Sequence, residues 1–318
     1  MAKIFDFRDT KEALGVYYGG NAGAKDAIIH AGAVWMIKYP KTTRDMKNLQ
    51  LFYTTSPLSE YLGSKIYETF GIPTHRTLLG MRNNKVVVAC EDFTRSVCPD
   101  HVGRSVITKQ LVPFHDLKNS FMSSDLESYS GTGSETLLDE VLATVKGQKD
   151  LKYISGTTDR FWDMFVVDAF IGNSDRNNGN WGILIGMDGE VSLAPVYDNG
   201  NAFFNKRSLV QMEKRLLDES LIYQDACQTV TCAYKYTGLD NEGHSINPFI
   251  FMAKREDADC NSAMERFVQN VNMEKIEKMI NSIPEAVGSF AIMPPVQKEF
   301  YKKILAVRYS KIVESASR

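Results

Sequence analysis

The chain has 318 residues, of which 43% are hydrophobic and 24% are charged, and its formal net charge is -2. This length is sufficient for two lobes or two modest domains that enclose an apolar core. A net charge so close to zero argues against general binding to nucleic acid or to anionic membranes, and we expect neither as a direct partner.

Cysteine usage and the N-terminus indicate where the protein resides. The five cysteines include no Cys-x-x-Cys pair, which fits a reduced cytosolic chain better than a disulfide scaffold or a zinc site. Charged residues interrupt the N-terminal segment, unlike in a secretory signal. No apolar run approaches the roughly 18 to 20 residues that cross a bilayer. We therefore expect a cytoplasmic protein, or one that is exported without a recognisable signal peptide.

A glycine-rich run at residues 18–25 is the first motif that suggests ligand binding. Glycines let the backbone approach a phosphate and point N–H groups at it, and a lysine adds positive charge. Taken alone, the run is more simply interpreted as a hairpin turn, because it has neither the Gly-Lys-Ser/Thr of a P-loop nor a complete Gly-x-Gly-x-x-Gly. The residues that would contact phosphates here are Gly19, Gly20, Gly23 and Lys25.

An apolar, strand-like run at residues 33–40 carries a single lysine, Lys38. A lysine on a buried strand needs an anion, either a carboxylate or a ligand phosphate. Residues 56–71 predict a helix, with Ser56 as the N-cap, a proline in the first turn and a glycine after the end. Glu60 lies in the first turns of this helix, where its carboxylate would reach Lys38. Alternatively, Glu60 only favours the helix N-terminus electrostatically.

A β-hairpin follows, with predicted strands at residues 74–81 and 85–90. It leads to a connector at residues 91–93, and we place the boundary here between a first lobe, residues 1–92, and a second lobe, residues 93–318. In a kinase this connector contacts the adenine through backbone groups. The candidate nucleotide contacts in this region are Cys90, Glu91 and Phe93.

The next segments predict helices. Residues 106–119 and 136–145 have helical patterns, and we interpret the Ser/Gly/Asp-rich stretch between them as a surface connector. Residues 161–171 are apolar nearly all round, which predicts a buried helix that ends at Gly172. We expect backbone or basic groups to satisfy the two acidic residues within this helix, rather than a catalytic role, for Asp163 and Asp168.

The segment after this helix has the composition of a catalytic loop. Asp175 and Asn180 lie five residues apart, the spacing of the phosphotransfer loop in which Asp accepts the proton of the nucleophile and Asn holds a metal. Two apolar runs at residues 181–185 and 191–195, joined by a turn, predict a hairpin that brings Asn180 and Asp198 to the same end. Their oxygen atoms are the hard donors that Mg²⁺ prefers.

The rest of the chain carries no further chemical motif. Helical periods continue at residues 208–217, 273–280 and 296–313. The five histidines have no metal-ligand spacing, so we assign them no chemistry.

Together, the motifs follow the order of a kinase: glycine turn, strand lysine, helix glutamate, connector, Asp-x4-Asn loop, hairpin and metal-binding aspartate. Several stretches also resemble the HipA-like serine/threonine kinases, most closely the short form of that family. The catalytic loop is the specific part of this resemblance, and the glycine turn is not. The stretches that carry it are Ala33–Pro40, Ser59–Tyr61, Val87–Cys90, Phe161–Asp168, Gly172–Gly182 and Leu193–Asp198.

The resemblance implies an α+β, two-lobed, protein-kinase-like fold. A small β-rich N-lobe and a larger, mainly helical C-lobe would have ATP between them. Asp175 would be the catalytic base, and Asn180 with Asp198 would hold Mg²⁺. Lys38 would act on the nucleotide phosphates, with Glu60 in support.

The resemblance also implies partners. It suggests a protein substrate with a serine or threonine, a role as a toxin or effector, and an antitoxin as a candidate partner. Some members of the family autophosphorylate a serine in the glycine-rich loop. Residues 19–25 contain neither serine nor threonine, which puts that switch in doubt for this chain.

Two other functions stay open at this point. The loop from Asn173 to Trp181 also resembles that of type II phosphatidylinositol 4-kinases, although no basic or amphipathic membrane-docking surface is evident. A nucleotide-binding pseudokinase that acts by binding a partner is the other alternative. The intact set of Lys38, Asp175, Asn180 and Asp198 argues against it.

Overall fold

The computed structural model describes residues 1–19, 24–44, 51–125, 131–239 and 242–318. The chain divides into two compact units, each assembled from three separate segments. The first comprises residues 1–108, 199–222 and 272–306, and the second comprises residues 109–198, 223–271 and 307–318. The predicted lobes were continuous segments that meet at residues 92 and 93, and that boundary stays a prediction.

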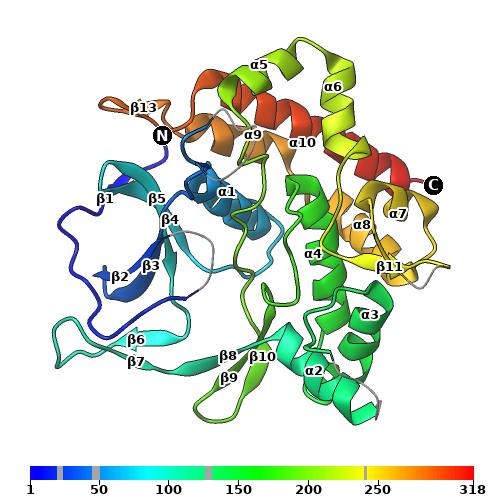
Figure 1. The fold of residues 1–318 in the computed structure, drawn as a ribbon, viewed down its shortest axis with the longest axis horizontal. Helices are drawn as coiled ribbons and strands as arrows, with labels where there is room; N and C mark the ends of the chain where they lie inside the picture. The colour runs from blue at the N-terminus through cyan, green and yellow to red at the C-terminus, as the bar shows by residue number, and fades with distance from the viewer. Residues whose placement is uncertain (20–23, 45–50, 126–130, 240–241) are drawn as a thin grey trace. The chain divides into compact units, whose positions relative to one another are not determined.

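A five-stranded sheet forms the centre of the first unit (Figure 1). The strand order is β1-β4-β5-β3-β2, and only the pairing of β1 with β4 is parallel among these strands. Aromatic and branched apolar side chains pack on it, including Trp35 and Ile37 of the lysine-bearing strand. The strands are β1 (Phe5–Asp6), β2 (Lys25–His30), β3 (Ala33–Lys38), β4 (Thr77–Arg82) and β5 (Lys85–Glu91).

Two-residue turns fix the register of this sheet. Ala31 and Gly32 join β2 to β3, and Asn83 and Asn84 join β4 to β5, all with positive φ angles between 48° and 76°. Such turns match the twist of paired strands, and glycine and asparagine tolerate this conformation. The resulting register pairs Lys38 with Lys25 on β2 and with Val88 on β5, so Lys38 lies at the end of β3.

Helix α1 (Ser56–Thr69) packs against β4 and β5. The helix begins close to the predicted position, but Thr55 is the N-cap residue instead of Ser56. Its buried face is apolar and includes Leu62 and Ile66, which are inaccessible to solvent. The first unit also contains β6 (Arg95–Val97), β7 (Ser105–Ile107), α5 (Leu209–Leu216), most of α6 (Glu219–Tyr223), α9 (Met273–Ser282), β13 (Ala286–Val287), β14 (Phe290–Ala291) and the first half of α10 (Pro295–Ala316).

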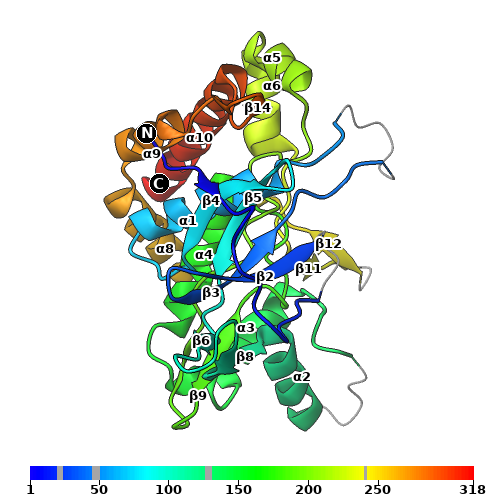
Figure 2. The same ribbon diagram turned by 90° about the vertical axis from the view of Figure 1, so that its left-hand side faces the viewer.

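The second unit is built around helix α4 (Thr157–Ile171), which has α8 beside it (Figure 2) and also contacts α7 (Figure 1). Nearly every residue of its second half is buried, as its apolar composition predicted. A three-stranded antiparallel sheet has the order β10-β9-β8. The other elements are β8 (Lys109–Pro113), α2 (Phe114–Asp125), α3 (Leu138–Gly147), η1 (Leu151–Tyr153), β9 (Gly182–Gly186), β10 (Val191–Leu193), η2 (Gln224–Gln228), β11 (Lys235–Thr237), β12 (Gly243–Ser245), α7 (Pro248–Lys254) and α8 (Ala258–Asn270).

The predicted helix at residues 106–119 is wrong in its first half. Residues 105–107 and 109–113 form strands β7 and β8, which pair with β6 and β9, and the helix begins only at Phe114. Backbone pairing with strands from other parts of the sequence outweighs the local helical pattern here. Among the residues that the structure describes, no helix is long and apolar enough to cross a membrane.

Candidate active site

The loop with the Asp-x4-Asn spacing begins where α4 ends. Gly172 closes the helix in the left-handed conformation, with φ of 73°, and its N–H donates to the carbonyl oxygen of Asp168. A Cβ at this position would lie 2.4 Å from Nη1 of Arg308, so only glycine fits without a shift. The chain therefore leaves the helix at a point that both the backbone conformation and the packing require.

The side chain of Arg176 connects this loop to the segments on either side of it. Its guanidinium is buried and forms an ion pair with Asp168, with 2.9 Å between Nε and Oδ2. Nη1 donates to the backbone oxygen of Asn180, at 2.9 Å, and also to that of Tyr197. One side chain thus joins helix α4, the end of the loop and the residue before Asp198.

Asp175 lies on the exposed side of this loop. Its carboxylate accepts a hydrogen bond of 3.0 Å from Nδ2 of Asn177, and its N–H donates to Oδ1 of Asn173 at 3.2 Å. Nδ2 of Asn180 donates to the backbone oxygen of Asp175 at 2.7 Å. Because this bond engages the amide nitrogen, Oδ1 is the atom of Asn180 that suits a metal ion.

Asp198 follows the β9–β10 hairpin and adopts a left-handed backbone with φ of 61°. Such a conformation costs a residue with a side chain about 1 to 2 kcal/mol. The neighbouring Tyr197 is fixed on both sides, because its backbone oxygen accepts from Arg176 and its hydroxyl donates to the oxygen of Gly179 at 3.1 Å. The surroundings of Asp198 therefore maintain a conformation that its sequence alone disfavours.

The other predicted pair lies in the first unit. Nζ of Lys38 is 2.7 Å from Oε2 of Glu60, whose side chain is only 1% exposed. The second oxygen, Oε1, is 3.1 Å from Nε2 of His75 and accepts the N–H of Asn199 at 2.9 Å. The contact that the sequence suggested between Lys38 and Glu60 is present, and two further groups hold the same carboxylate.

This environment keeps Glu60 ionised. Burial by itself would raise the pKa of the carboxyl group. The positive charge of Lys38 and the hydrogen bond from His75 outweigh that effect and hold the pKa of Glu60 well below its ordinary value.

The segment after Asp198 is fastened to helix α1. Nδ2 of Asn199 donates to Oγ of Ser64 at 3.1 Å, and Oγ of Ser59 donates to the oxygen of Ala202 at 2.9 Å. Gly200 lies close to Glu60, because a Cβ there would be 3.3 Å from Oε2. Residues 199–202 and helix α1 therefore form one packed element of the first unit.

The remaining predicted nucleotide contacts are less distinctive. Nζ of Lys25 donates to the backbone oxygen of Gly19. Gly20 and Gly23 lie outside the described residues.

The connector after β5 is tied into the sheet. Glu91 forms an ion pair with Arg76, whose backbone oxygen also accepts the N–H of Glu91 at 2.9 Å. The next amide, that of Asp92, donates to the oxygen of Val34 at 2.9 Å. Cys90 is buried at the end of β5, and Phe93 is partly buried beyond it.

Two acidic residues of α4, Asp163 and Asp168, have basic partners, as expected. Asp168 pairs with Arg176, and Asp163 pairs with Arg266 at 2.8 Å. Burial raises the pKa of Asp163, and the bond from Arg266 opposes that shift.

Three residues of these sites were not singled out by sequence: His75, Arg176 and Asn199. His75 and Asn199 reach Glu60 from positions 15 and 139 residues away, so no local spacing marks them. Arg176 had a usable signal. A buried helix that carries Asp168 requires a positive partner, and Arg176 follows a few residues later.

Comparisons with known proteins identify relatives of this chain. Residues 19–215 match the HipA-like C-terminal domain family. The chain is 31% identical over 309 residues to the serine/threonine-protein kinase CtkA of Helicobacter pylori, covering 94% of this chain and 83% of that protein.

Two solved structures are similar to the structure of this chain. The crystal structure of the H. pylori proinflammatory kinase CtkA is similar with a TM-score of 0.82 and 28% identity, covering 99% of this chain and 96% of that one. HipA of Shewanella oneidensis MR-1, solved with HipB and operator DNA, is similar with a TM-score of 0.55 over 95% of this chain and 67% of its own. Its identity of 12% shows a likeness of fold alone.

Proposed function

This chain belongs to the family of HipA-like serine/threonine kinases, and on that premise we propose that it transfers the γ-phosphoryl group of Mg-ATP to a serine or threonine hydroxyl of another protein. The observation that carries the proposal is the buried ion pair of Lys38 and Glu60, with 2.7 Å between Nζ and Oε2. The proposal includes the two-lobed, protein-kinase-like organisation, with lobes at residues 1–92 and 93–318.

Asp175 is the general base in this proposal. Its carboxylate is exposed and accepts from Asn177, so it is oriented and still accessible to a substrate hydroxyl. It would accept the hydroxyl proton as the oxygen attacks phosphorus, and the bond from the γ-phosphorus to the bridging oxygen of ADP would break.

Asn180 and Asp198 are the residues that would hold Mg²⁺. An amide oxygen and a carboxylate are hard oxygen donors, and the hydrogen bond of Asn180 to the backbone of Asp175 orients its amide. The metal, when bound, neutralises charge on the phosphates. The chain's own contribution is to fix the donors, through Arg176 on one side and the backbone conformation of Asp198 on the other.

Lys38 would act on the nucleotide phosphates. An ammonium on a strand end must be balanced when no phosphate is bound, and Glu60 provides that charge. The carboxylate is itself held by His75 and Asn199, so it presents Lys38 in a defined position. Gly19, Lys25, Cys90, Glu91 and Phe93 remain proposed nucleotide contacts, as do Gly20 and Gly23.

Mass spectrometry of phosphorylated proteins tests the proposal. Incubation of the wild type with Mg-ATP and a casein-like protein should produce phosphoserine or phosphothreonine, whereas Asp175→Asn should not. Asp188→Asn is the matched control, because Asp188 is an exposed aspartate in the β9–β10 turn of the same unit. Phosphorylation of phosphoinositide vesicles in place of the protein would indicate the lipid kinase. Calorimetry that detects binding of Mg-ATP, without phosphorylation of either substrate, would indicate the nucleotide-binding pseudokinase.

A role as a toxin or effector, with an antitoxin as partner, is a further part of the proposal. Family membership supports it, as does the similar fold of S. oneidensis HipA, which belongs to a toxin–antitoxin system and was solved in complex with HipB. Growth arrest on expression of the wild type, absent for Asp175→Asn, would support the toxin. Equal growth of both strains would contradict it.

A further inference from the structure

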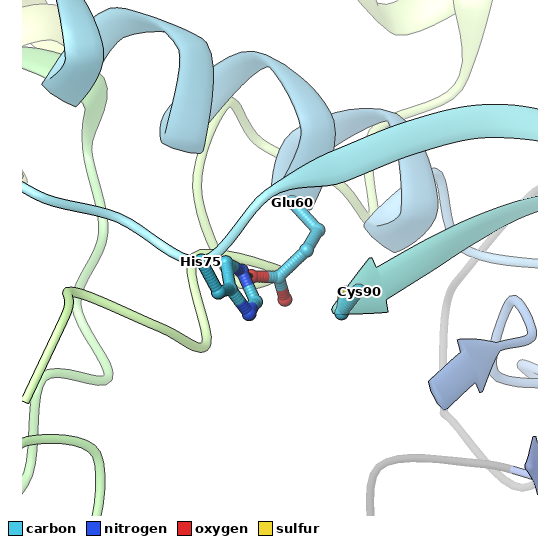
Figure 3. Close-up of side chains that lie close together, drawn as sticks. All are labelled: Glu60, His75 and Cys90. Carbon is cyan, nitrogen blue, oxygen red and sulfur yellow. Dashed lines mark hydrogen bonds and ion pairs between the residues drawn. The ribbon is translucent and has the colours of Figure 1, made fainter. Parts of the chain in front are cut away.

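Three potential metal ligands of different chemistry converge in the first unit (Figure 3). Glu60 extends from helix α1, His75 lies in the segment before β4, and Cys90 is in strand β5. One ligand atom from each residue lies within 4.8 Å of the others. All three residues are at most 4% exposed. The cluster is therefore buried, unlike the groups of acidic side chains that are common on protein surfaces.

The donor set selects a class of metal. A thiolate and an imidazole are ligands of Zn²⁺ and similar ions, whereas Mg²⁺ and Ca²⁺ prefer oxygen alone. Zn²⁺ lies about 2.0 to 2.3 Å from such ligands, so tetrahedral geometry places two ligand atoms about 3.4 to 3.6 Å apart. The three ligand atoms lie within 4.8 Å of one another, and Oε1 of Glu60 lies 3.1 Å from Nε2 of His75.

Charge and supporting contacts favour a cation here. Glu60 is ionised, and its Oε1 is already fixed by the N–H of Asn199 at 2.9 Å. Hydrogen bonds of this kind orient metal ligands and contribute strongly to affinity. With Cys90 as a thiolate, the two anionic ligands offset most of the charge of a divalent cation, and with Lys38 included one net positive charge remains, which lowers the cost of burying the cation.

We propose that Glu60, His75 and Cys90 form a binding site for a divalent cation of the zinc type. The cation binds Oε1 of Glu60, Sγ of Cys90 and Nε2 of His75, which exchanges its hydrogen bond to Glu60 for the bond to the metal while Nδ1 carries the ring proton. The thiol of Cys90 loses its proton to solvent in the process, so binding releases one proton per metal. This site uses neither of the residues proposed to hold Mg²⁺, Asn180 and Asp198.

Occupancy of this site would affect Lys38. Glu60 would share its two oxygens between the cation and Lys38, whose Nζ lies 2.7 Å from Oε2. The positive charges repel each other across the carboxylate, so the ion pair of Lys38 and Glu60 weakens. An effect on phosphotransfer rests on the proposed function, whereas metal binding does not.

Titration of the full chain with Zn²⁺ against a chromophoric chelator tests the proposal. The wild type should bind one equivalent in competition with the chelator. Cys90→Ser and His75→Gln should each bind at least about tenfold more weakly. Cys260→Ser is the matched control, because Cys260 is a buried cysteine of the second unit and should leave the affinity unchanged.

Titration of the wild type with Co²⁺ needs no variant and avoids misfolding as an explanation. Coordination by Cys90 should produce a thiolate-to-cobalt charge-transfer band, and the release of one proton should accompany it. Absence of both the band and chelator competition in the wild type would overturn the proposal. So would full affinity in Cys90→Ser, or loss of affinity in Cys260→Ser alone. None of these measurements depends on kinase activity, so their failure leaves the proposed function untouched.

Discussion

Asp168 and Arg176 form an ion pair of 2.9 Å in which the two side chains are only 4% and 2% exposed. The pair connects the buried helix α4 to the loop that carries Asp175 and Asn180. Since Arg176 also donates to the backbone oxygens of Asn180 and Tyr197, one guanidinium connects the helix, the end of the loop and the residue before Asp198.

Removal of one member of this pair should be strongly destabilising. Asp168→Asn leaves a buried guanidinium without its counter-charge, and we expect a loss of about 3 to 5 kcal/mol in the free energy of unfolding, measured with denaturant. Asp259→Asn serves as the control, because the pair of Lys146 and Asp259 is solvent-exposed and contributes no more than about 1 kcal/mol. Equal stabilities of the two variants would contradict the importance assigned to Arg176.

Substitution of the proposed base, Asp175, should lower the rate of phosphotransfer without weakening the binding of Mg-ATP. Asp175→Asn removes the proton acceptor, and we expect the rate of phosphotransfer to fall by about 10² to 10⁴ while the Kd for Mg-ATP stays nearly constant. Asp198→Asn removes a proposed metal ligand, so it should weaken binding of Mg-ATP as well. Single-turnover kinetics and calorimetry measure the two quantities. Full activity of Asp175→Asn would show that the role belongs to another residue.

Glu60 should make stability depend on pH in acid. Its pKa is lower in the folded state than its ordinary value of 4.5, so below that value the unfolded chain binds a proton that the folded chain does not. The stabilisation is therefore complete above about pH 4.5 and declines as pH falls towards the folded-state pKa. The difference in unfolding free energy between wild type and Glu60→Gln should shrink accordingly.

The matched control for that measurement is Glu68→Gln on the same helix. Its pair with Lys65 is partly exposed, and the substitution should change stability by no more than about 1 kcal/mol. A wild type and a Glu60→Gln variant that lose stability in parallel from pH 7 to pH 3 would show that Glu60 is not held in its charged form.

Two glycines allow steric overlap to be separated from backbone strain. Gly172 and Gly189 both have positive φ, of 73° and 83°, but only Gly172 has atoms where a Cβ would be placed, with Arg308 at 2.4 Å. Both Gly→Ala variants should therefore lose about 1 to 2 kcal/mol through strain, and Gly172→Ala should lose more through displacement of Arg308. Thermal unfolding of the two variants gives the comparison, and a larger loss in Gly189→Ala would be inconsistent with it.

Sequence patterns predicted features that depend on neighbouring residues. The turn at Asn83 and Asn84, the helix with Pro57 in its first turn and the glycine that ends α4 all follow from local conformational preferences, and the structure contains each of them. The fit of Asp175 and Asn180 to a known loop pattern is also local. These local predictions are correct because the tertiary structure favours the same conformations as the local sequence.

Local sequence patterns could not predict features that depend on residues far away in the chain. Residues 105–107 and 109–113 form strands because β6 and β9 pair with them, and β9 begins some 70 residues later in the chain. His75 was assigned no chemistry, since its partners Glu60 and Cys90 lie 15 residues away on either side instead of at a metal-binding spacing. No sequence periodicity predicts that these three residues lie close together. They do so only because α1 packs against β4 and β5.

The two oxygens of Glu60 have a consequence for how helix α1 can move. Lys38 bonds to one oxygen, while the other accepts the amide of Asn199, the residue that directly follows Asp198 in the chain. Because residues 199–202 are also hydrogen-bonded to Ser59 and Ser64 of α1, an outward displacement of the helix would break the bond of Glu60 to Lys38 and carry Asn199 with it. One movement of α1 would therefore release the strand lysine and pull on the residue that directly follows the proposed metal ligand.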